Sequence, residues 1–498
     1  MRRLYIILFA LIVASSIAMQ SIEVTSTPGK LSELLQNDKN ATALIIHGTI
    51  DVRDFYFIAE SLPNLLQIDL SDTEIMAYNS NTLYFGSKAN YEAGVLPTLC
   101  MFGKQYTTII LPSTLTFIDD GALSGCSKIT KLQFPSTLTG VGEYALYDCD
   151  ELTSIEIPAN VKNINNYAFA KCDKLVSVKY VASATPITIN NYCFYNSPML
   201  SSVTLAPNTY SIGAGAFASC PQLSNIDFPN SLALLSEEAF KATPLINVDL
   251  SKCTSLRTIG QWAFADNKAM KSIKLPPNIE SIGNGAFFYN TSLSEITLPD
   301  GIKNISDFML TGCSSIACDK LLTNNITEIG KYAFSDWSQM LYFYIPEKIS
   351  NIGDNAFERC KNLANLDIAA ITVPTLGNSV FAEINQPTVA LHVPAQSYTA
   401  YKNAAQWKEF NVKSDLTDIE AVKDENIKVF FVNTLLNIEA TSAIKEVRMY
   451  DFSGIELVRL APNSNSTQIN TETYFGNNYI LGVMLHNGTI KQIKLARK

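Results

Sequence analysis

The side chains that most often carry out chemistry in proteins are sparse in this chain. It has three histidines, His47, His392 and His486, which fall in three different segments. A general base must lie within hydrogen-bond reach of its substrate and near other polar groups. His47 stands in the apolar run LIIHGTI and His392 in another short apolar segment. Both are better explained as tolerated strand residues than as catalytic bases.

Motifs with a known catalytic geometry are also missing from the sequence. It contains no HExxH, GxSxG or P-loop pattern. Residues 213–215 and 283–285 begin like a dinucleotide-binding loop, but both lack the third glycine and are expected to be turns. Neighbouring acids such as Glu237 and Glu238 do not define the carboxylate pair of a glycosidase. The sequence therefore predicts a protein that is not an enzyme and needs no cofactor or metal.

The cysteines share a position instead of forming a cluster. Six of the ten lie three residues after a recurring large apolar residue: Cys126, Cys149, Cys172, Cys220, Cys313 and Cys360. Elsewhere the same position holds Ser197, Thr243, Asn267, Asn290, Trp337 and Ile384. A position that mostly accepts Cys, Ser, Thr or Asn predicts a column of small side chains that hydrogen-bond the backbone of a turn.

A zinc site and disulfide bonds are two more specific interpretations of these cysteines. Zinc is not expected, because ligands spread along a repeat array cannot converge on one ion. Disulfides between neighbouring repeats, such as Cys126–Cys149 or Cys149–Cys172, are an alternative, since stacked strands lie about 5 Å apart. Side chains that run parallel in a column rarely have disulfide geometry, so free thiols are expected.

The large apolar residue that precedes this position recurs with a fixed period. We call it the anchor, and successive anchors are separated by 23, 24 or 25 residues. The anchors are Leu123, Leu146, Phe169, Phe194, Phe217, Phe240, Phe264, Phe287, Leu310, Phe334, Phe357 and Phe381. Such a period predicts a solenoid, in which each repeat is one supersecondary unit and stacking creates the core.

Each repeat begins with alternating apolar and variable residues, as in Ile155-Glu156-Ile157. A two-residue period predicts a short strand with one face inward, and the proline that often follows, as at Pro158, ends it. The anchor then fills the space between repeats. We predict a β-rich α/β solenoid, a right-handed leucine-rich repeat array of 23–25-residue units, followed by a small all-β sandwich.

The chain is expected to have five parts. Residues 1–18 have the basic, apolar and small-residue order of a signal peptide, and their apolar run is short for a membrane span. Residues 22–106 are expected to be an N-terminal capping region with irregular repeats and a short helix in KLSELL, and residues 107–411 the solenoid with a helical C-terminal cap. Residues 412–424 are predicted to be a linker, and 425–498 the sandwich.

Composition limits the partners of this chain. The formal net charge is −9, which argues against a nucleic-acid surface. Hydrophobic residues make up 47% and charged residues 17%, so the bulk of the chain is expected to fold. After the signal peptide, no stretch is long and apolar enough to span a bilayer, so a soluble, exported chain is expected.

The repeat unit resembles a known family. The pattern L-x-x-I-x-L-P-x-x-[VIL]-x-x-I-x-x-x-A-F-x-x-C, carried for example by IEIPANVKNINNYAFAKC at 155–172, is similar to the BspA-like, treponemal-type leucine-rich repeat. The resemblance covers roughly residues 40–411. It implies surface or secreted bacterial proteins that adhere to host matrix proteins or other cells. Their ligands vary, so the resemblance assigns no binding residue.

The last segment resembles the carboxy-terminal sorting domain of type IX secretion in Bacteroidetes. The residues that carry this resemblance are 436–438, 447–454, 476–481 and 493–495. Gly476 lies three residues before Tyr479, whereas the family pattern places a glycine directly before its Tyr motif. A sandwich without a sorting role is therefore the alternative.

The residue between the two apolar strand positions is expected to face solvent. We call the successive residues at this place the strand-face column. Its candidate ligand-binding residues, with one neighbouring tyrosine, are Glu156, Lys179, Asp227, Asp249, Lys274, Tyr342, Tyr344 and Asp367. The column also holds Gln133, Thr204, Thr297 and His392. A partner groove with Tyr342 and Tyr344 as an exposed aromatic anchor is one interpretation, and a solvated sheet face is the other.

These observations favour a secreted or surface-displayed solenoid that binds a protein or glycan ligand on host or neighbouring cells. It is expected to be extracellular or on the outer cell surface, without a transmembrane span in the mature chain. The alternative is a structural or scaffolding protein of the envelope that has no external ligand.

Overall fold

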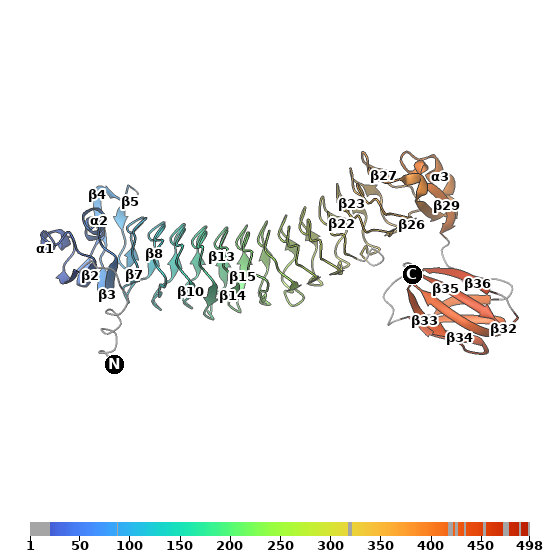
Figure 1. The fold of residues 1–498 in the computed structure, drawn as a ribbon, viewed down its shortest axis with the longest axis horizontal. Helices are drawn as coiled ribbons and strands as arrows, with labels where there is room; N and C mark the ends of the chain where they lie inside the picture. Colours follow the sequence, from blue (N-terminus) through green and yellow to red (C-terminus); the bar gives the residue numbers. More distant parts are fainter. Residues whose placement is uncertain are drawn as a thin grey trace. The chain divides into compact units, whose positions relative to one another are not determined.

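The structure is a computed structural model that describes residues 20–86, 88–316, 321–416, 422–423, 427–432, 435–451, 455–471, 478–487 and 490–496. The predicted signal peptide, Cys318, Gly454 and Gly476 lie outside the described residues. The chain divides into two compact units. They are Met1–Ser183 together with Asn196–Met199, and Ala184–Tyr195 together with Leu200–Lys498. Within each unit, successive repeats stack as parallel coils (Figure 1).

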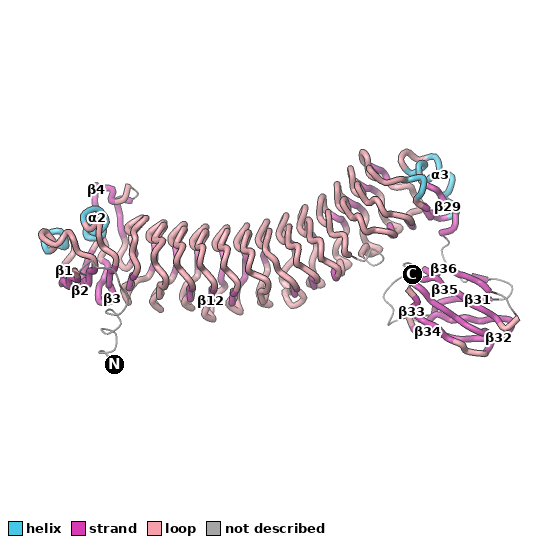
Figure 2. The backbone as a smooth tube through the Cα atoms, in the orientation of Figure 1, coloured by secondary structure: helices cyan, strands magenta, loops and turns pink. Residues whose placement is uncertain are grey.

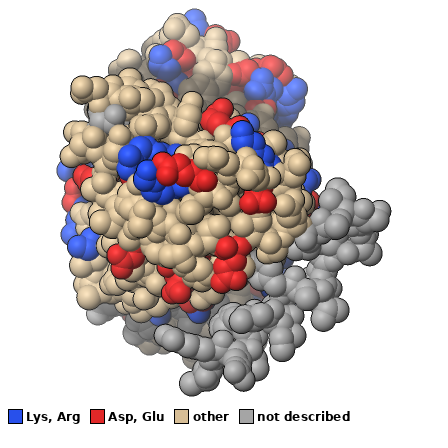
Figure 3. Space-filling view, turned by 90° about the vertical axis from the view of Figure 1, so that its left-hand side faces the viewer, with Lys and Arg blue, Asp and Glu red and all other residues tan. Residues whose placement is uncertain are grey.

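The first unit begins with a capping region. Its parallel sheet has the order β1-β2-β3-β7, formed by β1 (Ser21–Ser26), β2 (Ala43–Ile50), β3 (Gln67–Ile75) and β7 (Thr108–Ile110). The expected short helix is α1 (Leu31–Leu34). An antiparallel hairpin, β4 (Tyr78–Tyr84) and β5 (Lys88–Tyr91), follows β3. Figure 3 shows basic and acidic side chains interspersed on the N-terminal end, the polar outer face that a solenoid end needs.

A second helix in this region, α2 (Val52–Ser61), was not predicted from the sequence. It starts at a capping box, in which the Asp51 side chain accepts a hydrogen bond from the Arg53 amide and Asp54 accepts one from the Asp51 amide. Phe55 and Ile58 lie on its buried face. The cap and this apolar stripe together explain why the segment is helical.

The repeats themselves are made of short strands and turns, so the array is a β-solenoid (Figure 2). One row of strands carries the strand-face column. In the first unit it continues with β10 (Ser154–Ile157) and β12 (Ser177–Tyr180). In the second unit it comprises β14 (Ser202–Thr204), β17 (Asn247–Asp249), β19 (Ser272–Lys274), β21 (Glu295–Ile296), β24 (Tyr342–Ile345), β26 (Asn365–Ile368), β28 (Ala390–Pro394) and β29 (Asn411–Leu416).

A second row of two- to four-residue strands forms another side of each coil. In the first unit these are β6 (Val95–Leu96), β8 (Phe117–Ile118), β9 (Gly140–Val141) and β11 (Asn163–Ile164). In the second unit they are β13 (Ile187–Ile189), β15 (Thr209–Ile212), β16 (Leu234–Leu235), β18 (Thr258–Ile259), β20 (Ser281–Ile282), β22 (Asn304–Ile305), β23 (Glu328–Ile329), β25 (Asn351–Ile352) and β27 (Thr375–Leu376). All pair in parallel with the equivalent strand of a neighbouring repeat.

The anchors fill the core between repeats, as predicted. The rings of Phe194, Phe217, Phe240, Phe264 and Phe287 stack in succession with centroid separations of 5.3, 5.3, 5.7 and 6.1 Å. All five side chains are fully buried. Offset stacks of this spacing add a specific attraction to the area that each ring buries.

Each anchor sits in a tight turn that we call the turn edge. The residues two before and two after every anchor have a left-handed backbone, as at Tyr144 (φ 55°) and Asp148 (φ 62°) around Leu146. The same holds for Leu99 and Gly103 around Met101, which reveals one more anchor than the sequence predicted. Left-handed conformations are costly for residues other than glycine, so their recurrence shows that the stack enforces this turn.

Backbone hydrogen bonds explain how the stack enforces it. The amides of Tyr144, Leu146 and Asp148 donate to carbonyls of the next repeat, to Asn166, Ala168 and Ala170 at 3.0, 2.8 and 3.0 Å. Equivalent bonds recur along the array, for example from Leu123 to Ala145 at 2.8 Å. The alternating left-handed residues thus aim three amides per repeat at the next coil without forming a β-strand.

The solenoid ends in the helical cap that the sequence predicted. It contains α3 (Tyr398–Asn403) and a 3₁₀ turn, η5 (Trp407–Glu409). Trp407 and Phe410 cover the last anchor, Phe381, with ring separations of 5.2 and 4.8 Å. The linker predicted from residue 412 is wrong at its start, because β29 pairs in parallel with β28 through residue 416.

The C-terminal segment is an antiparallel sheet region. Its strands are β30 (Val422–Lys423), β31 (Ile427–Val432), β32 (Leu435–Tyr450), β33 (Glu456–Leu460), β34 (Ser464–Asn470), β35 (Asn478–Leu485) and β36 (Ile490–Ala496). The first half of β32 pairs with β31 and β34, and the second half pairs with β33 and β35. Both halves contribute to one apolar cluster, which contains Leu436, Ile438, Val447 and Met449.

Candidate functional site

The column of cysteines and related residues is a hydrogen-bond ladder, as predicted. Most of these side chains donate to the carbonyl of the anchor in the preceding repeat, whereas Asn290 Nδ2 donates to Met270 Sδ at 3.9 Å and Ile384 has no donor. Examples are Cys149 Sγ to Leu123 O at 3.4 Å, and Thr243 Oγ1 to Phe217 O at 2.7 Å. Equivalent donors are Cys126, Cys172, Cys220, Asn267, Cys313 and Cys360. Even Trp337 takes part, through Nε1 to Leu310 O at 2.6 Å.

These thiols are structural groups. All nine described cysteines are buried and unbridged. Burial raises the pKa of Cys126, Cys172 and Cys313 to about 12, which keeps them protonated near neutral pH. A protonated, inaccessible thiol is a poor nucleophile and a poor metal ligand. The expectation that these thiols are free in the protein stays a prediction.

The three histidines lie at separate places in the fold. His47 lies in β2, with Nε2 2.8 Å from Glu23 Oε1 and Nδ1 3.4 Å from Asp72 Oδ2. The Glu23 hydrogen bond raises the pKa of His47 above its ordinary value, and Asp72 adds to the effect. His392 is buried in β28, and His486 Nε2 lies 2.8 Å from Asn463 Oδ1 in the C-terminal segment. Each histidine thus has local partners that explain it without catalysis.

The charged residues of the strand-face column pair with one another. Glu156 and Lys179 stand opposite in the register of β10 and β12, and their charged atoms are 2.9 Å apart. Asp249 and Lys274 occupy the same relation in β17 and β19, at 4.0 Å. All four are exposed, as expected, so they can meet a partner while balancing each other's charge. Asp227 is also exposed, but its segment forms no strand.

The aromatic part of the column differs from the prediction. Tyr342 and Tyr344 are half-buried, and the Tyr342 hydroxyl donates to Asp367 Oδ2 at 3.2 Å. Asp367 retains only 5% of its accessible surface and His392 only 8%, so solvent exposure was wrongly predicted for both. The cause is their position in register directly beside bulky neighbours, with Tyr344 facing Asp367 and Asp367 facing His392.

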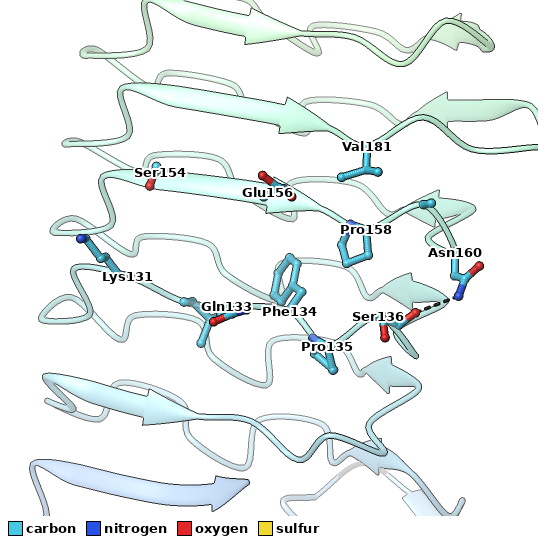
Figure 4. A pocket seen from close by; sticks show the side chains of 12 residues that line it. Lys131, Gln133, Phe134, Pro135, Ser136, Ser154, Glu156, Pro158, Asn160 and Val181 are labelled. Carbon is cyan, nitrogen blue, oxygen red and sulfur yellow. Dashed lines mark hydrogen bonds between the residues drawn. The ribbon is translucent and has the colours of Figure 1, made fainter. Parts of the chain in front are cut away.

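A cavity of about 800 Å³ opens on the strand face of the first unit. It is lined by residues 131–136, Ser154, Glu156, residues 158–160 and Val181. In Figure 4, the Phe134 ring points from its repeat toward β10, with Pro158 and Glu156 on the opposite side. The sequence placed Gln133 and Glu156 in the strand-face column but did not reveal the cavity between them.

Stacked parallel coils with buried Leu, Ile and Phe at fixed places define a leucine-rich repeat solenoid. The family model described as "BspA type Leucine rich repeat region" matches in six copies, over residues 97–188, 187–317 and 319–422. The chain therefore belongs to this family. Proteins built from such repeats commonly bind proteins along their exposed surfaces. The match indicates no enzyme family.

One solved structure, the first of the three that follow, gives the same fold. A leucine-rich repeat protein from Bacteroides ovatus aligns over 79% of this chain and 91% of its own, with 19% identity and a TM-score of 0.55. A leucine-rich repeat protein from Eubacterium ventriosum aligns over 73% and 90%, with 13% identity and a TM-score of 0.36. The pneumococcal vaccine antigen PcpA aligns over 80% and 93%, with 14% identity and a TM-score of 0.35. No curated protein matched the chain.

Among the described residues, no helix is long and apolar enough to cross a membrane. In the same part of the chain, no group of three or more His, Cys, Asp or Glu side chains is arranged to hold a metal ion. The exposed strand face, with its cavity and its paired charges, is therefore the candidate functional site.

Proposed function

We propose that this protein is exported, displayed on the cell surface, and binds a macromolecular partner through its strand face. The observation that carries the proposal is the contrast within each repeat. The turn edge repeats the same contacts throughout the array, whereas the strand-face column changes in charge and size from repeat to repeat. A uniform scaffold that presents variable, exposed side chains is the usual arrangement of a recognition surface.

Adhesion to host matrix proteins or to neighbouring cells is the form of binding that we propose, with a glycan as the second class of ligand. Membership of the BspA-type repeat family supports it. We further propose that residues 1–18 direct export and that the segment from 425 onward acts as a sorting domain. The antiparallel strands of that segment are compatible with the second role but also with a plain sandwich domain.

A binding screen of the full chain tests this function. The chain is immobilised and exposed to purified matrix proteins, a glycan array and partner cells. We expect saturable binding to at least one class, and loss of that binding when Asp227, Asp249 and Lys274 are replaced by alanine together. The matched control replaces Tyr144 and Lys171 on the turn edge with alanine and should leave binding unchanged.

The alternative function is an envelope scaffold without an external ligand. It would be favoured if the screen were negative in all three classes while deletion of the protein altered the permeability of the cell envelope. Binding that survives the strand-face substitutions but is lost in the turn-edge control would also contradict the proposal, because it would move the recognition surface to the other side of the repeats.

A further inference from the structure

The strand face is interrupted at two described places where a repeat forms no strand, residues 131–134 and 225–228. We call them the first and second strand breaks. Both have phenylalanine at the second inward position, in Leu132-Gln133-Phe134-Pro135 and Ile226-Asp227-Phe228-Pro229. Other repeats place Leu, Ile, Tyr or Val there: Leu111, Ile157, Tyr180, Leu205, Leu250, Leu275, Leu298, Ile345, Ile368 and Val393.

A phenyl ring accompanies both interruptions. Phe134 meets the anchor Phe169 at a ring separation of 6.3 Å, and Phe228 meets the anchor Phe240 at 5.5 Å. The inward position thus lies directly against an anchor ring, in a core packed at the density of a crystal. Ring size alone does not break the ladder, because Tyr180 occupies the same position in β12 and its strand pairs with β10.

The first strand break leaves one edge of β10 open. Val181 N donates to Ile157 O at 2.9 Å, so Ile157 pairs with the following repeat. Alternate residues of a parallel strand pair with opposite neighbours, and this alternation turns the main chain of Ser154 and Glu156 toward the break. In the described structure, no backbone hydrogen bond joins residues 131–134 to β10.

The two repeats are nevertheless held together on both sides of the break. Thr153 N donates to Thr130 O at 3.1 Å, and Asn160 Nδ2 donates to Ser136 O at 2.8 Å, the bond drawn in Figure 4. The opening is therefore a bounded cavity rather than a slot through the array. Ser154 and Glu156 of β10 line it together with Phe134, which is 6% exposed, and Pro158.

We propose that this cavity binds a short extended segment of a partner protein. The segment would pair its main chain with the open edge of β10 at Ser154 and Glu156, and lay one apolar side chain on Phe134 and Pro158. An unpaired strand edge recognises an extended peptide better than any other ligand, because both present alternating donors and acceptors. This inference rests on the proposed function and names the partner class and the place of binding.

The charges around the cavity favour a bound segment in which an acidic residue stands next to the apolar one. Glu156 is already balanced by Lys179 at 2.9 Å, whereas Lys131 lines the opposite side of the opening. The summed charge of Glu156, Lys179 and Lys131 is positive. A carboxylate in the bound segment would therefore be attracted to Lys131, and a basic residue there would be repelled.

Random heptapeptides displayed on phage, panned on the immobilised full chain, are the probe for this site. We expect enrichment of sequences with an apolar residue beside an acidic one. A capped synthetic peptide of the enriched sequence, followed by fluorescence polarisation, should bind the wild type. Phe134→Leu, which gives this repeat a residue common in the other repeats, should weaken that binding about tenfold or more, because it removes the aromatic ring on which the apolar side chain would lie.

The control is Phe228→Leu, the same substitution at the second strand break, which should leave peptide affinity unchanged. Lys131→Glu should weaken an acidic peptide about tenfold without requiring any change in the fold. Peptide panning that enriches nothing over an empty surface, or a peptide that binds Phe134→Leu as well as the wild type, overturns the proposal. The proposal is also overturned if the cavity binds only glycans or only a second copy of the chain.

The outcomes separate this inference from the proposed function. If Phe134→Leu abolishes peptide binding but matrix proteins or cells still bind, the cavity is one of several contacts. If matrix proteins or cells bind while no peptide does, the cavity proposal fails and the strand-face function stands. If neither peptides nor macromolecular partners bind the wild type, both proposals fail. Amide hydrogen exchange across residues 130–157 checks that each variant remains folded.

Discussion

The turn edge and the strand face of the same repeats follow opposite rules. At the turn edge, a ring stack, two left-handed residues and a side-chain bond to the preceding anchor recur from repeat to repeat. On the strand face, the ladder is broken at two places within the described residues, and the outward side chains vary. If the strand face binds a partner as proposed, stability and recognition lie on different sides of one repeat, and substitutions on the two sides should have effects of different size.

The largest expected effect is the loss of an anchor. Phe217→Ala removes a ring stacked between two others and leaves a cavity in the core, which should cost about 3–5 kcal/mol of stability. The matched change on the strand-face side is Phe228→Ala, which should cost less because Phe228 is half-buried. Urea unfolding followed by circular dichroism measures both. An equal loss of stability would contradict the division between the two sides.

The second-largest effect on stability is expected in the column of hydrogen-bonding residues three positions after each anchor. Thr243→Val keeps the shape of the side chain but removes the hydroxyl donor to the Phe217 carbonyl, at an expected cost of about 1–3 kcal/mol. Thr243→Cys is the control, since cysteine fills the same place in six other repeats and keeps a donor. If both variants unfold at the same urea concentration, the hydrogen bond is not what selects the residue type at this position.

A smaller effect is expected at the left-handed positions. Gly215 has a φ of 57°, and a Cβ there would stand 2.3 Å from the ring of Tyr192. Gly215→Ala should therefore cost about 1–2 kcal/mol, from backbone strain and from displacement of the ring. Thermal melts of the single variant and of Gly215→Ala combined with Tyr192→Ala separate the two causes. If Tyr192→Ala restores none of the stability lost in Gly215→Ala, the contact with the ring is not a cause of that loss.

The paired charges of the strand face should matter least for stability. Lys179→Ala breaks an ion pair whose two side chains are about 60% exposed, so the change should be below about 0.5 kcal/mol. Salt titration of the unfolding midpoint is the measurement. A loss above 1 kcal/mol would show that this column is part of the scaffold, against its proposed role in recognition.

The protonation of His47 in β2 predicts how the stability of the protein depends on pH. The pKa of His47 is raised in the folded state, above its ordinary value of 6.5, chiefly by Glu23. Its contribution to stability is therefore complete below about pH 6.5 and is lost as pH rises through the folded-state pKa. Proton NMR of the imidazole should show a raised value that falls in Glu23→Gln and falls less in Asp72→Asn. An unchanged pKa in Glu23→Gln would refute the assignment.

The turn edge could be predicted from the sequence because it is uniform. Twelve anchors and the donor position three residues later stand at a constant spacing, so the solenoid and the hydrogen-bond ladder could be predicted. The left-handed pairs could not, because residues as different as Tyr144, Asp148, Glu238 and Lys171 occupy them. Glycine fills some of these positions, but bonds to the next repeat impose the same conformation on residues of other types.

The strand face resisted prediction for the opposite reason. Burial of Asp367 depends on which side chains stand beside it in register, and the first break accompanies a phenyl ring at Phe134 where leucine would carry an isopropyl group. The period alone carries neither piece of information. Helix α2 was missed in the same way, since the capping box at Asp51 lies where the repeat period had not yet begun.

The side-chain ladder also gives the array a direction. Each donor reaches back to the preceding anchor, whereas the turn-edge amides reach forward, so the two ends of a repeat expose different unsatisfied groups. At the C-terminal end the side chain of Gln406 bonds the last turn, accepting from Val380 N at 2.9 Å and donating to Gly377 O at 2.7 Å. Whole repeats could thus be inserted or lost within the array during evolution, whereas the two caps are neither dispensable nor interchangeable.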